Sequence, residues 1–468
     1  MPTSVLSSLR ELGIGAQRFL IFTAANQVAW QCVAGLFLVL FGRAIAMPEA
    51  WVGLLQAFMP LSTVLVVFTV PLIERTGPRR LLLFTWGIRN VLAVPTFGMA
   101  WAISLWGPQA AWYVLLFATL SFCVARAIGV GGWFPWLYEV VPNRLQGVYF
   151  SSEAAIAQLT NIALMLAVAI GLQGHPGLSA YFWIYLMGIL AGFLSLAAIW
   201  RIPGGQQMPP TTRSARPRSE GYRHVLADRD YVRYVLRACV GQSALWWLQT
   251  IYVLYLRDQL KFSDTQIMCQ VAAGSLGLAL TVRHWGHYAD RFGSIPAIMF
   301  SLAAHALIGL GWIVLLPGAA WTPPLSWLLV VLGNVFNGAA AMAMNRGMLR
   351  RVREEGRVGY TNFWIVGTAL ATGVTPILAG VTVQWLQLTG FRICFLLTAL
   401  TSIACALSFF SVAQEKDKPP IPGLNDLLKP SIPMRTLWRI VWITLGLDES
   451  NRSAVEGKPG SPPRETES

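Results

Sequence analysis

Twelve runs of about 20 predominantly apolar residues dominate this sequence. A transmembrane α-helix needs about 20 such residues to cross the hydrocarbon core of a bilayer. Only 12% of the residues are charged, about half the share found in soluble domains, so the chain cannot cover an ordinary water-exposed surface. We therefore expect an all-α polytopic membrane protein with twelve transmembrane helices. The runs lie near residues 19–41, 51–73, 81–105, 110–136, 152–172, 179–200, 232–256, 265–284, 295–316, 325–347, 361–385 and 391–413.

The basic residues between these runs predict the orientation. If the N-terminus is cytoplasmic, twenty arginines fall in the inner segments, and only four basic residues fall in the outer ones. Cytoplasmic loops carry the excess of Lys and Arg in membrane proteins. We expect a multi-pass protein of the cytoplasmic (inner) membrane, with both termini in the cytoplasm. The same placement argues against a nucleic-acid partner, which would need a solvated basic face with stacking aromatic residues.

The polar segments divide the chain into four parts. Residues 201–230 are rich in Pro, Gly, Ser, Thr and Arg, which is typical of a flexible linker. We expect an N-terminal six-helix bundle (1–200), this cytoplasmic linker (201–230), a C-terminal six-helix bundle (231–413) and a cytoplasmic tail (414–468). In the tail, apolar residues at helical spacing fit either an amphipathic helix on the inner leaflet or a largely disordered segment; they are Leu437, Trp438, Val441, Trp442 and Leu445.

The two halves begin alike. In the first run Arg18 is followed by Gln27 and Gln31, and in the seventh Arg233 is followed by Gln242 and Trp246. The segments after the second run of each half also match: Glu74-Arg75-Thr76-Gly77 corresponds to Asp290-Arg291-Phe292-Gly293. An internal duplication explains both matches, and internal repeats are typical of secondary transporters. The two bundles are thus expected to be pseudo-symmetric.

Six plus six helices, a basic linker and duplicated inner loops resemble the major facilitator superfamily over residues 15–413. The family's inner-loop motif, G-x-L-a-D-r-x-G-r-r, is matched by Gly286-His287-Tyr288-Ala289-Asp290-Arg291-Phe292-Gly293. A carboxylate, an adjacent arginine and a turn-forming glycine can lock two helix ends in one conformation and release them in another. We predict a gating role for Glu74, Arg75, Gly77, Asp290, Arg291 and Gly293. The alternative is a solvated turn whose arginines only set the topology.

Polar residues in the middle of the runs suggest a substrate site. Arg126 has no carboxylate at similar depth, so it could bind an anionic substrate group through two parallel hydrogen bonds; backbone carbonyls or an Asn could equally satisfy it. The resemblance implies that the first, fourth, seventh and tenth helices line a central cavity. The expected substrate-binding residues are Gln27, Trp30, Gln31, Arg126, Gln242, Trp246, Asn334 and Asn337. The alternative for this set is hydrogen bonding between helices. Asn161, His305 and Arg89 fit packing or helix-end positions better.

These features favour a transporter that moves a small organic solute by alternating access. The solute would carry an anionic group and an aromatic or sugar-like face. The alternative is a non-transporting assembly factor or sensor on the same scaffold. No catalytic constellation is present, so we do not expect an enzyme. The six cysteines form no ligand pattern, and we expect no metal or cofactor. The expected partners are the solute and the lipid bilayer, the protein is expected to be a monomer, and the sequence identifies no coupling ion.

Overall fold

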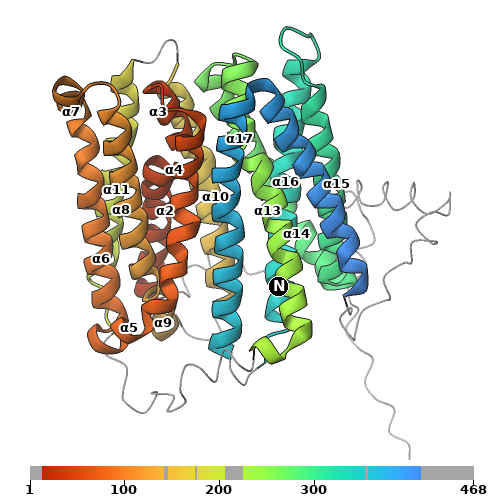
Figure 1. Cartoon of the computed structure of the whole chain (residues 1–468). Helices are drawn as coiled ribbons and strands as arrows, with labels where there is room; N and C mark the ends of the chain where they lie inside the picture. The colour runs from red at the N-terminus through yellow and green to blue at the C-terminus, as the bar shows by residue number, and fades with distance from the viewer. Residues whose placement is uncertain (1–12, 142–145, 174–176, 206–224, 354–356, 413–468) are drawn as a thin grey trace, which may run out of the picture.

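The computed structural model describes residues 13–141, 146–173, 177–205, 225–353 and 357–412, and their secondary structure is entirely helical (Figure 1). The predicted amphipathic helix of the tail and most of the linker lie outside these residues. In the N-terminal half the helices are α2 (Ile14–Ala34), α3 (Phe37–Ala44), α4 (Glu49–Thr63), α5 (Val70–Thr76), α6 (Pro78–Ala93), α7 (Met99–Trp106), α8 (Ala110–Val130), α9 (Trp133–Val140), α10 (Gln146–Gly171) and α11 (Leu178–Trp200).

The C-terminal half contains fewer and longer helices. They are α13 (Arg229–Leu254), α14 (Asp264–Phe292), α15 (Ser294–Val314), α16 (Thr322–Leu349) and α17 (Arg357–Ser408). Short 3-10 helices occur at Val64–Phe68, Val94–Gly98 and Phe409–Ser411, and one π-helical turn, η5, at Tyr255–Gln259.

The described residues contain ten helical stretches that are long and apolar enough to cross a membrane. Helix α13 is not among them; it carries Arg233 and Arg237 in its first half and Gln242 and Gln249 beyond them. Helix α17 counts once but contains two arms, since Gln387 has a non-helical backbone (φ 48°, ψ −126°). The chain turns back there, as Figure 1 shows. With α13 and both arms of α17, the stretches account for the expected twelve crossings.

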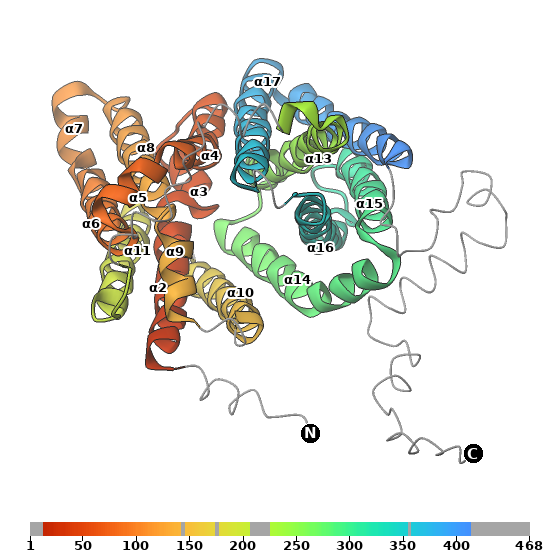
Figure 2. The same cartoon turned by 90° about the horizontal axis from the view of Figure 1, so that it is seen from below.

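Seen along the helix axes, α2–α11 gather on one side and α13–α17 on the other (Figure 2). The two halves meet where α4 packs on α17 and where α10 packs on α14. At the first contact the backbones touch: a Cβ atom on Gly53 would overlap the carbonyl oxygen of Pro376. A Cβ atom on Gly380 would lie 2.6 Å from that of Glu49. Small residues permit such close approach of helices within a membrane.

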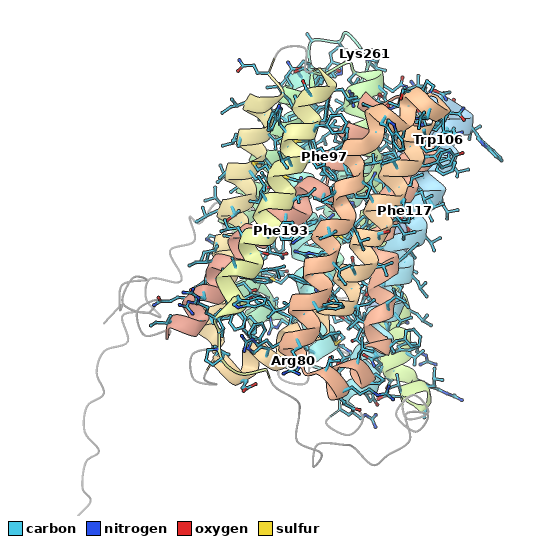
Figure 3. The ribbon with its side chains drawn as sticks, turned by 90° about the vertical axis from the view of Figure 1, so that its left-hand side faces the viewer. Arg80, Phe97, Trp106, Phe117, Phe193 and Lys261 are labelled. Atoms are coloured by element: carbon cyan, nitrogen blue, oxygen red, sulfur yellow. The ribbon has the colours of Figure 1, made fainter. Side chains whose placement is uncertain are left out.

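The hydrophobic core differs between the two ends of the molecule. We call the end that holds α3 and Lys261 the upper end, and the end that holds α5 and Arg80 the lower end (Figures 1 and 3). Toward the upper end one cluster of buried residues joins both halves; it includes Phe37, Phe41, Leu55, Tyr252, Ile267 and Val383. Toward the lower end each half has a core of its own, built around Phe19 and Trp136 in the first and around Tyr234 and Met344 in the second. Among the described residues the buried core is therefore shared between the halves toward the upper end and divided between them toward the lower end.

Candidate functional site

Two predicted substrate-binding residues on α2 bind each other. Trp30 Nε1 donates a hydrogen bond to Gln27 Oε1 over 2.8 Å, and both side chains are half-buried. They lie three residues apart and so share one face of the helix. The indole and the amide thus form one polar and aromatic surface on this face of α2.

The third polar residue of α2 starts a chain of hydrogen bonds between the halves. Gln31 Nε2 donates to Asn161 Oδ1 on α10 over 2.8 Å. Asn161 Nδ2 then donates to Ser275 Oγ on α14 over 3.0 Å. The sequence assigned Asn161 to packing, but in the structure it joins a predicted site residue to the other half. Its position within an apolar run was the only signal, because α10 is not one of the helices expected to line a cavity.

Arg126 lies on α8 and is half-buried. Its Nε atom is buried and has no hydrogen-bond partner among the described residues. No ion pair with a described carboxylate is found for it either. Its own carbonyl oxygen accepts a hydrogen bond from Trp86 Nε1 over 3.1 Å, which anchors the backbone of α8 against α6. Burying a guanidinium with an unpaired donor in a membrane-spanning helix costs free energy. Such charges usually face a ligand site or a transport pathway.

A second buried arginine lies against the same part of α8, beside Phe122, which is one helical turn before Arg126. Arg89 on α6 is fully buried, with its guanidinium carbon 3.9 Å from the ring centre of Trp86 and 5.1 Å from that of Phe122. Its Nη2 donates to Asn26 Oδ1 over 2.6 Å, while Nε and Nη1 lack described partners. Aromatic faces stabilise such a cation. Packing is thus part of its role, as expected, but the sequence did not identify it as a second charge beside Arg126.

The predicted residues of the C-terminal half are more scattered. Gln242 Nε2 lies 3.8 Å from Met344 Sδ. Asn334 Nδ2 donates to the carbonyl oxygen of Val330 in its own helix over 2.9 Å. Trp246 and Asn337 are half-buried. Among the described residues no hydrogen bond joins this group to the N-terminal group, so the eight residues do not form a single bonded site in this state.

The two predicted gating turns share an unusual backbone. Gly77 (φ 81°, ψ 147°) ends α5 and begins α6, and Gly293 (φ 95°, ψ 167°) ends α14 and begins α15. Only glycine adopts such angles without strain. Glu74 and Arg75 are exposed beside the first turn. Asp290 and Arg291 lie in the last turn of α14, but their side chains are outside the described part of the chain.

Charged residues at the upper end form a contact that the sequence did not identify. Arg43, at the end of α3, lies with Nη2 3.2 Å from Glu49 Oε1 and donates from Nη1 to the carbonyl oxygen of Met47 over 2.7 Å. Its Nε lies 3.1 Å from Asp258 Oδ2 in the other half, at ion-pair distance although not aligned as a hydrogen bond. These side chains are 15–19% exposed. The arginine therefore carries an ionic link between the halves.

A second cross-half group lies beside it. Arg257 Nε lies 3.2 Å from Asp264 Oδ1, and its Nη1 donates to the carbonyl oxygen of Leu40 in the first half over 2.6 Å. The hydroxyl of Tyr181, also in the first half, donates to Asp264 Oδ2. Further cross-half hydrogen bonds run from Thr265 to the Leu172 carbonyl and from the Ala50 amide to Gln384. The sequence placed these charges in outer segments but could not pair them.

Burial raises the pKa of Asp258 above its usual value. The positive charges of Arg43 and Arg257 lower it, and the nearby Glu49 carboxylate raises it. Since the pKa is raised overall, the cost of burying this charge outweighs the attraction of its two cationic neighbours.

No group of three or more His, Cys, Asp or Glu side chains among the described residues could hold a metal ion. All six cysteines are free thiols.

The geometry defines the class of protein: an all-helical polytopic membrane protein built from two helical halves. Solved structures match nearly all of the described body. A mutant of the nucleoside transporter NupG matches with 11% identity and a TM-score of 0.68, over 86% of this chain and 100% of its own. A D-xylose–proton symporter matches with 13% identity and a TM-score of 0.65, over 87% of this chain and 99% of its own. At such identity these matches show the fold.

A third structure is a bacterial homologue of the iron transporter ferroportin in an inward-facing state. It matches with 14% identity and a TM-score of 0.61, over 84% of this chain and 97% of its own. No curated protein matches the chain. The sequence model of the Major Facilitator Superfamily matches residues 242–447. Over that part of its length the chain is similar to this superfamily.

Proposed function

We propose that this protein is a transporter that carries a small organic solute across the cytoplasmic membrane by alternating access. The observation that carries the proposal is the asymmetric core: one shared cluster toward the upper end and two separate clusters toward the lower end. A two-bundle protein that opens alternately to each side must have one state of this kind, joined at one end and divided at the other. The match of residues 242–447 to the Major Facilitator Superfamily model and the fold support the same function.

The contacts that join the upper end are suited to repeated opening. Several of them are hydrogen bonds and ion pairs between half-buried groups, such as Arg43 with Asp258 and Arg257 with the Leu40 carbonyl. Water can replace each of these partners when the halves separate, so the joined and separated states can be close in free energy. The excess of arginines at the lower end supports a cytoplasmic position for that end and for both termini.

The solute is proposed to bind between the bundles, to the eight predicted residues. Two neighbouring guanidiniums without described carboxylate partners, Arg126 and Arg89, favour a solute with an anionic group. The paired Gln27 and Trp30 offer an amide and an aromatic face for a ring or sugar. We also propose that the turns at Gly77 and Gly293 gate the lower end, and that the protein acts as a monomer.

Flux measurements test the transport proposal. Purified protein in liposomes would be offered labelled aromatic carboxylates, sugar phosphates, nucleosides and pentoses, with and without a pH gradient. We expect flux of at least one class, lost in Arg126→Ala and reduced in Gln242→Ala. Arg233→Gln, which removes an exposed lower-end charge, should transport normally.

A solute-independent experiment tests the conformational part. Spin labels at Gln109 and Lys261 would report the upper end, and labels at Thr76 and Arg229 the lower end; all four positions are exposed. Alternating access predicts two populations in which the upper distance grows as the lower distance shrinks. A single fixed distance at both ends, together with no flux, would refute the proposal and leave the non-transporting assembly factor or sensor as the better interpretation.

A further inference from the structure

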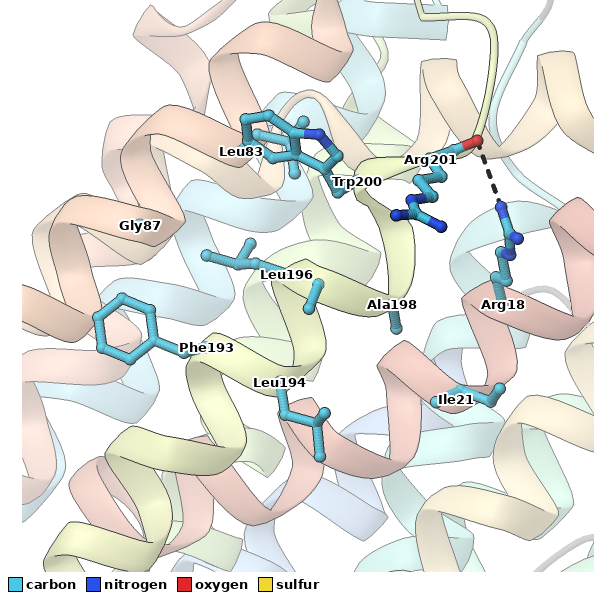
Figure 4. Close-up of a pocket in the computed structure, with 11 residues that line it drawn as sticks. Arg18, Ile21, Leu83, Gly87, Phe193, Leu194, Leu196, Ala198, Trp200 and Arg201 are labelled. Atoms are coloured by element: carbon cyan, nitrogen blue, oxygen red, sulfur yellow. Dashed lines mark hydrogen bonds between the residues drawn. The ribbon is translucent and has the colours of Figure 1, made fainter.

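A groove on the surface of the N-terminal half is lined by residues of α2, α6 and α11 (Figure 4), and these helices do not form the main contacts with the other half. Its volume is about 830 Å³. Apolar side chains line most of it, including Leu83, Phe193 and Leu196. Ile21 and Leu194 on its walls are 56% and 62% exposed, so this surface faces the hydrocarbon of the bilayer. Gly87 leaves room in its floor because it has no side chain: a Cβ atom there would meet one atom, at 3.9 Å.

The lower end of the groove is strongly basic. Arg18 and Arg201 line the groove itself. A second cavity of about 650 Å³ adjoins it, shares Leu83 and Trp200 with it, and is lined by Arg79 and Arg80. Four guanidiniums from three helix ends thus converge where the apolar groove ends. This is also the depth at which an interfacial tryptophan such as Trp200 is favoured.

These arginines are held in place but keep hydrogen-bond donors to spare. Arg18 Nη1 donates to the carbonyl oxygen of Arg201 over 3.3 Å, as Figure 4 shows, and Arg79 Nη2 donates to that of Trp200 over 2.6 Å. A guanidinium has five donor hydrogens, so most remain available. Among the described residues none of the four forms an ion pair with a carboxylate. The nearby Glu139 instead accepts a hydrogen bond from the Gly205 amide over 2.6 Å.

The backbone adds to the positive potential. Helix α6 begins at Pro78 with no side-chain cap, and Arg79 and Arg80 occupy its first turn. A helix N-terminus carries a partial positive charge and normally attracts acidic residues. Two arginines at that position repel the helix dipole unless an anion lies between them.

We propose that this groove binds an anionic phospholipid of the lower-end leaflet, with an acyl chain along α2, α6 and α11 and its phosphate among Arg18, Arg79, Arg80 and Arg201. A free phosphate would use the arginines but leave the apolar groove without a purpose. A neutral lipid would fill the groove but leave the basic end unbalanced. Basic pockets between helices at the cytoplasmic face bind anionic lipid headgroups in this way. The site does not depend on transport, because it lies on the surface of one half.

Native mass spectrometry of the full-length protein with equal amounts of phosphatidylglycerol and phosphatidylcholine tests the proposal. The wild type should retain phosphatidylglycerol preferentially. Arg80→Gln with Arg201→Gln should weaken that preference by about 30-fold, because each basic group near an anionic lipid contributes about a fivefold factor. The matched control removes two exposed charges from the lower end of the other half, Arg229→Gln with Arg233→Gln, and should keep the preference.

A second variant tests the apolar part without changing charge. Gly87→Leu places a side chain into the groove and should reduce retention of both lipids. The proposal is overturned if the Arg80 and Arg201 double variant keeps the wild-type preference, if the control loses as much, or if Gly87→Leu retains phosphatidylglycerol fully. Melting curves check that each variant is folded. If Gly87→Leu does not fold, the comparison of the two double charge variants alone tests the proposal.

Discussion

Replacing Arg43 by Gln should open the upper end of the molecule. This arginine lies 3.2 Å from Glu49 and 3.1 Å from Asp258, and all three side chains are less than 20% exposed. At 3.1 Å the attraction between unit charges is about 1.3 kcal/mol in water and about 5 kcal/mol at an effective dielectric constant of 20. Part of it offsets the cost of burying the charges. Without Arg43 two half-buried carboxylates lose their shared cation, which we expect to destabilise the joined state by about 1–3 kcal/mol.

A change of that size shifts the equilibrium between joined and separated upper ends by about 5- to 150-fold. The assay is the distance distribution between spin labels at Gln109 and Lys261, measured in lipid nanodiscs. Adding Asp258→Asn to Arg43→Gln should restore most of the joined population, because the uncompensated carboxylate is gone. Asp258→Asn alone should leave the upper end joined. If Arg43→Gln leaves the distances unchanged, or if Asp258→Asn alone opens the molecule as far, the reasoning fails.

Four further outcomes follow from the described contacts. The raised pKa of Asp258 means that the joined state binds more protons than a separated state in which this carboxyl is in water. Lowering the pH through the interval between the raised and the usual pKa of this carboxyl should therefore favour the joined state, as read from the same spin-label distances. The Asp258→Asn variant should lose this pH dependence. Gly53→Leu should hold the upper end apart, at a cost to the joined state of about 1–3 kcal/mol, because any Cβ there clashes with a backbone. Gly77→Ala should lower the melting temperature by several degrees through about 1–3 kcal/mol of backbone strain, whereas Gly98→Ala should not, since its φ is −79° and its Cβ meets open space. Asn161→Ala should cost the joined state about 1 kcal/mol for two lost interhelical hydrogen bonds.

Each of these has an outcome that would contradict it. An Asp258→Asn variant that keeps the wild-type pH response places the titrating group elsewhere. A joined upper end in Gly53→Leu would mean that α4 and α17 approach less closely than described. Equal melting temperatures for the two alanine variants would remove the strain argument, and an unchanged distance distribution in Asn161→Ala would reduce that residue to packing.

The turn at Gly77 and its counterpart at Gly293 were predictable because the signal is local. In both copies an acidic-Arg-x-Gly sequence ends a helix, and its glycine adopts a positive φ that other residues take only with strain. The number of crossings was predictable for the same kind of reason, because each membrane-spanning helix is recognised from the length and apolar composition of its own segment. Even α13 was expected from its apolar run although its first turns are charged.

The pairing of Arg43 with Asp258 could not be predicted in the same way. Both residues lie in short segments between runs, and which of several charges meet there depends on how the two halves dock. The bridge through Asn161 has the same origin: its partners are set by the contact of α10 with α14, and no periodicity in either helix encodes it. For the predicted solute site, single residues could be proposed from their depth in the membrane, but their grouping depends on the state of the molecule.

Where α4 meets α17, peptide groups touch through Gly53 and Gly380 with no side chains between them. Helices that interlock through large side chains must change rotamers before they can move past one another, and each change adds a barrier. At Gly53 and Gly380 no side chains interlock, so these two positions add no rotamer barrier, while Leu55 and Val383 pack in the shared cluster nearby. If the halves rock against each other as proposed, Gly53 and Gly380 are places where backbone can slide past backbone, whereas the ionic links at the upper end must break.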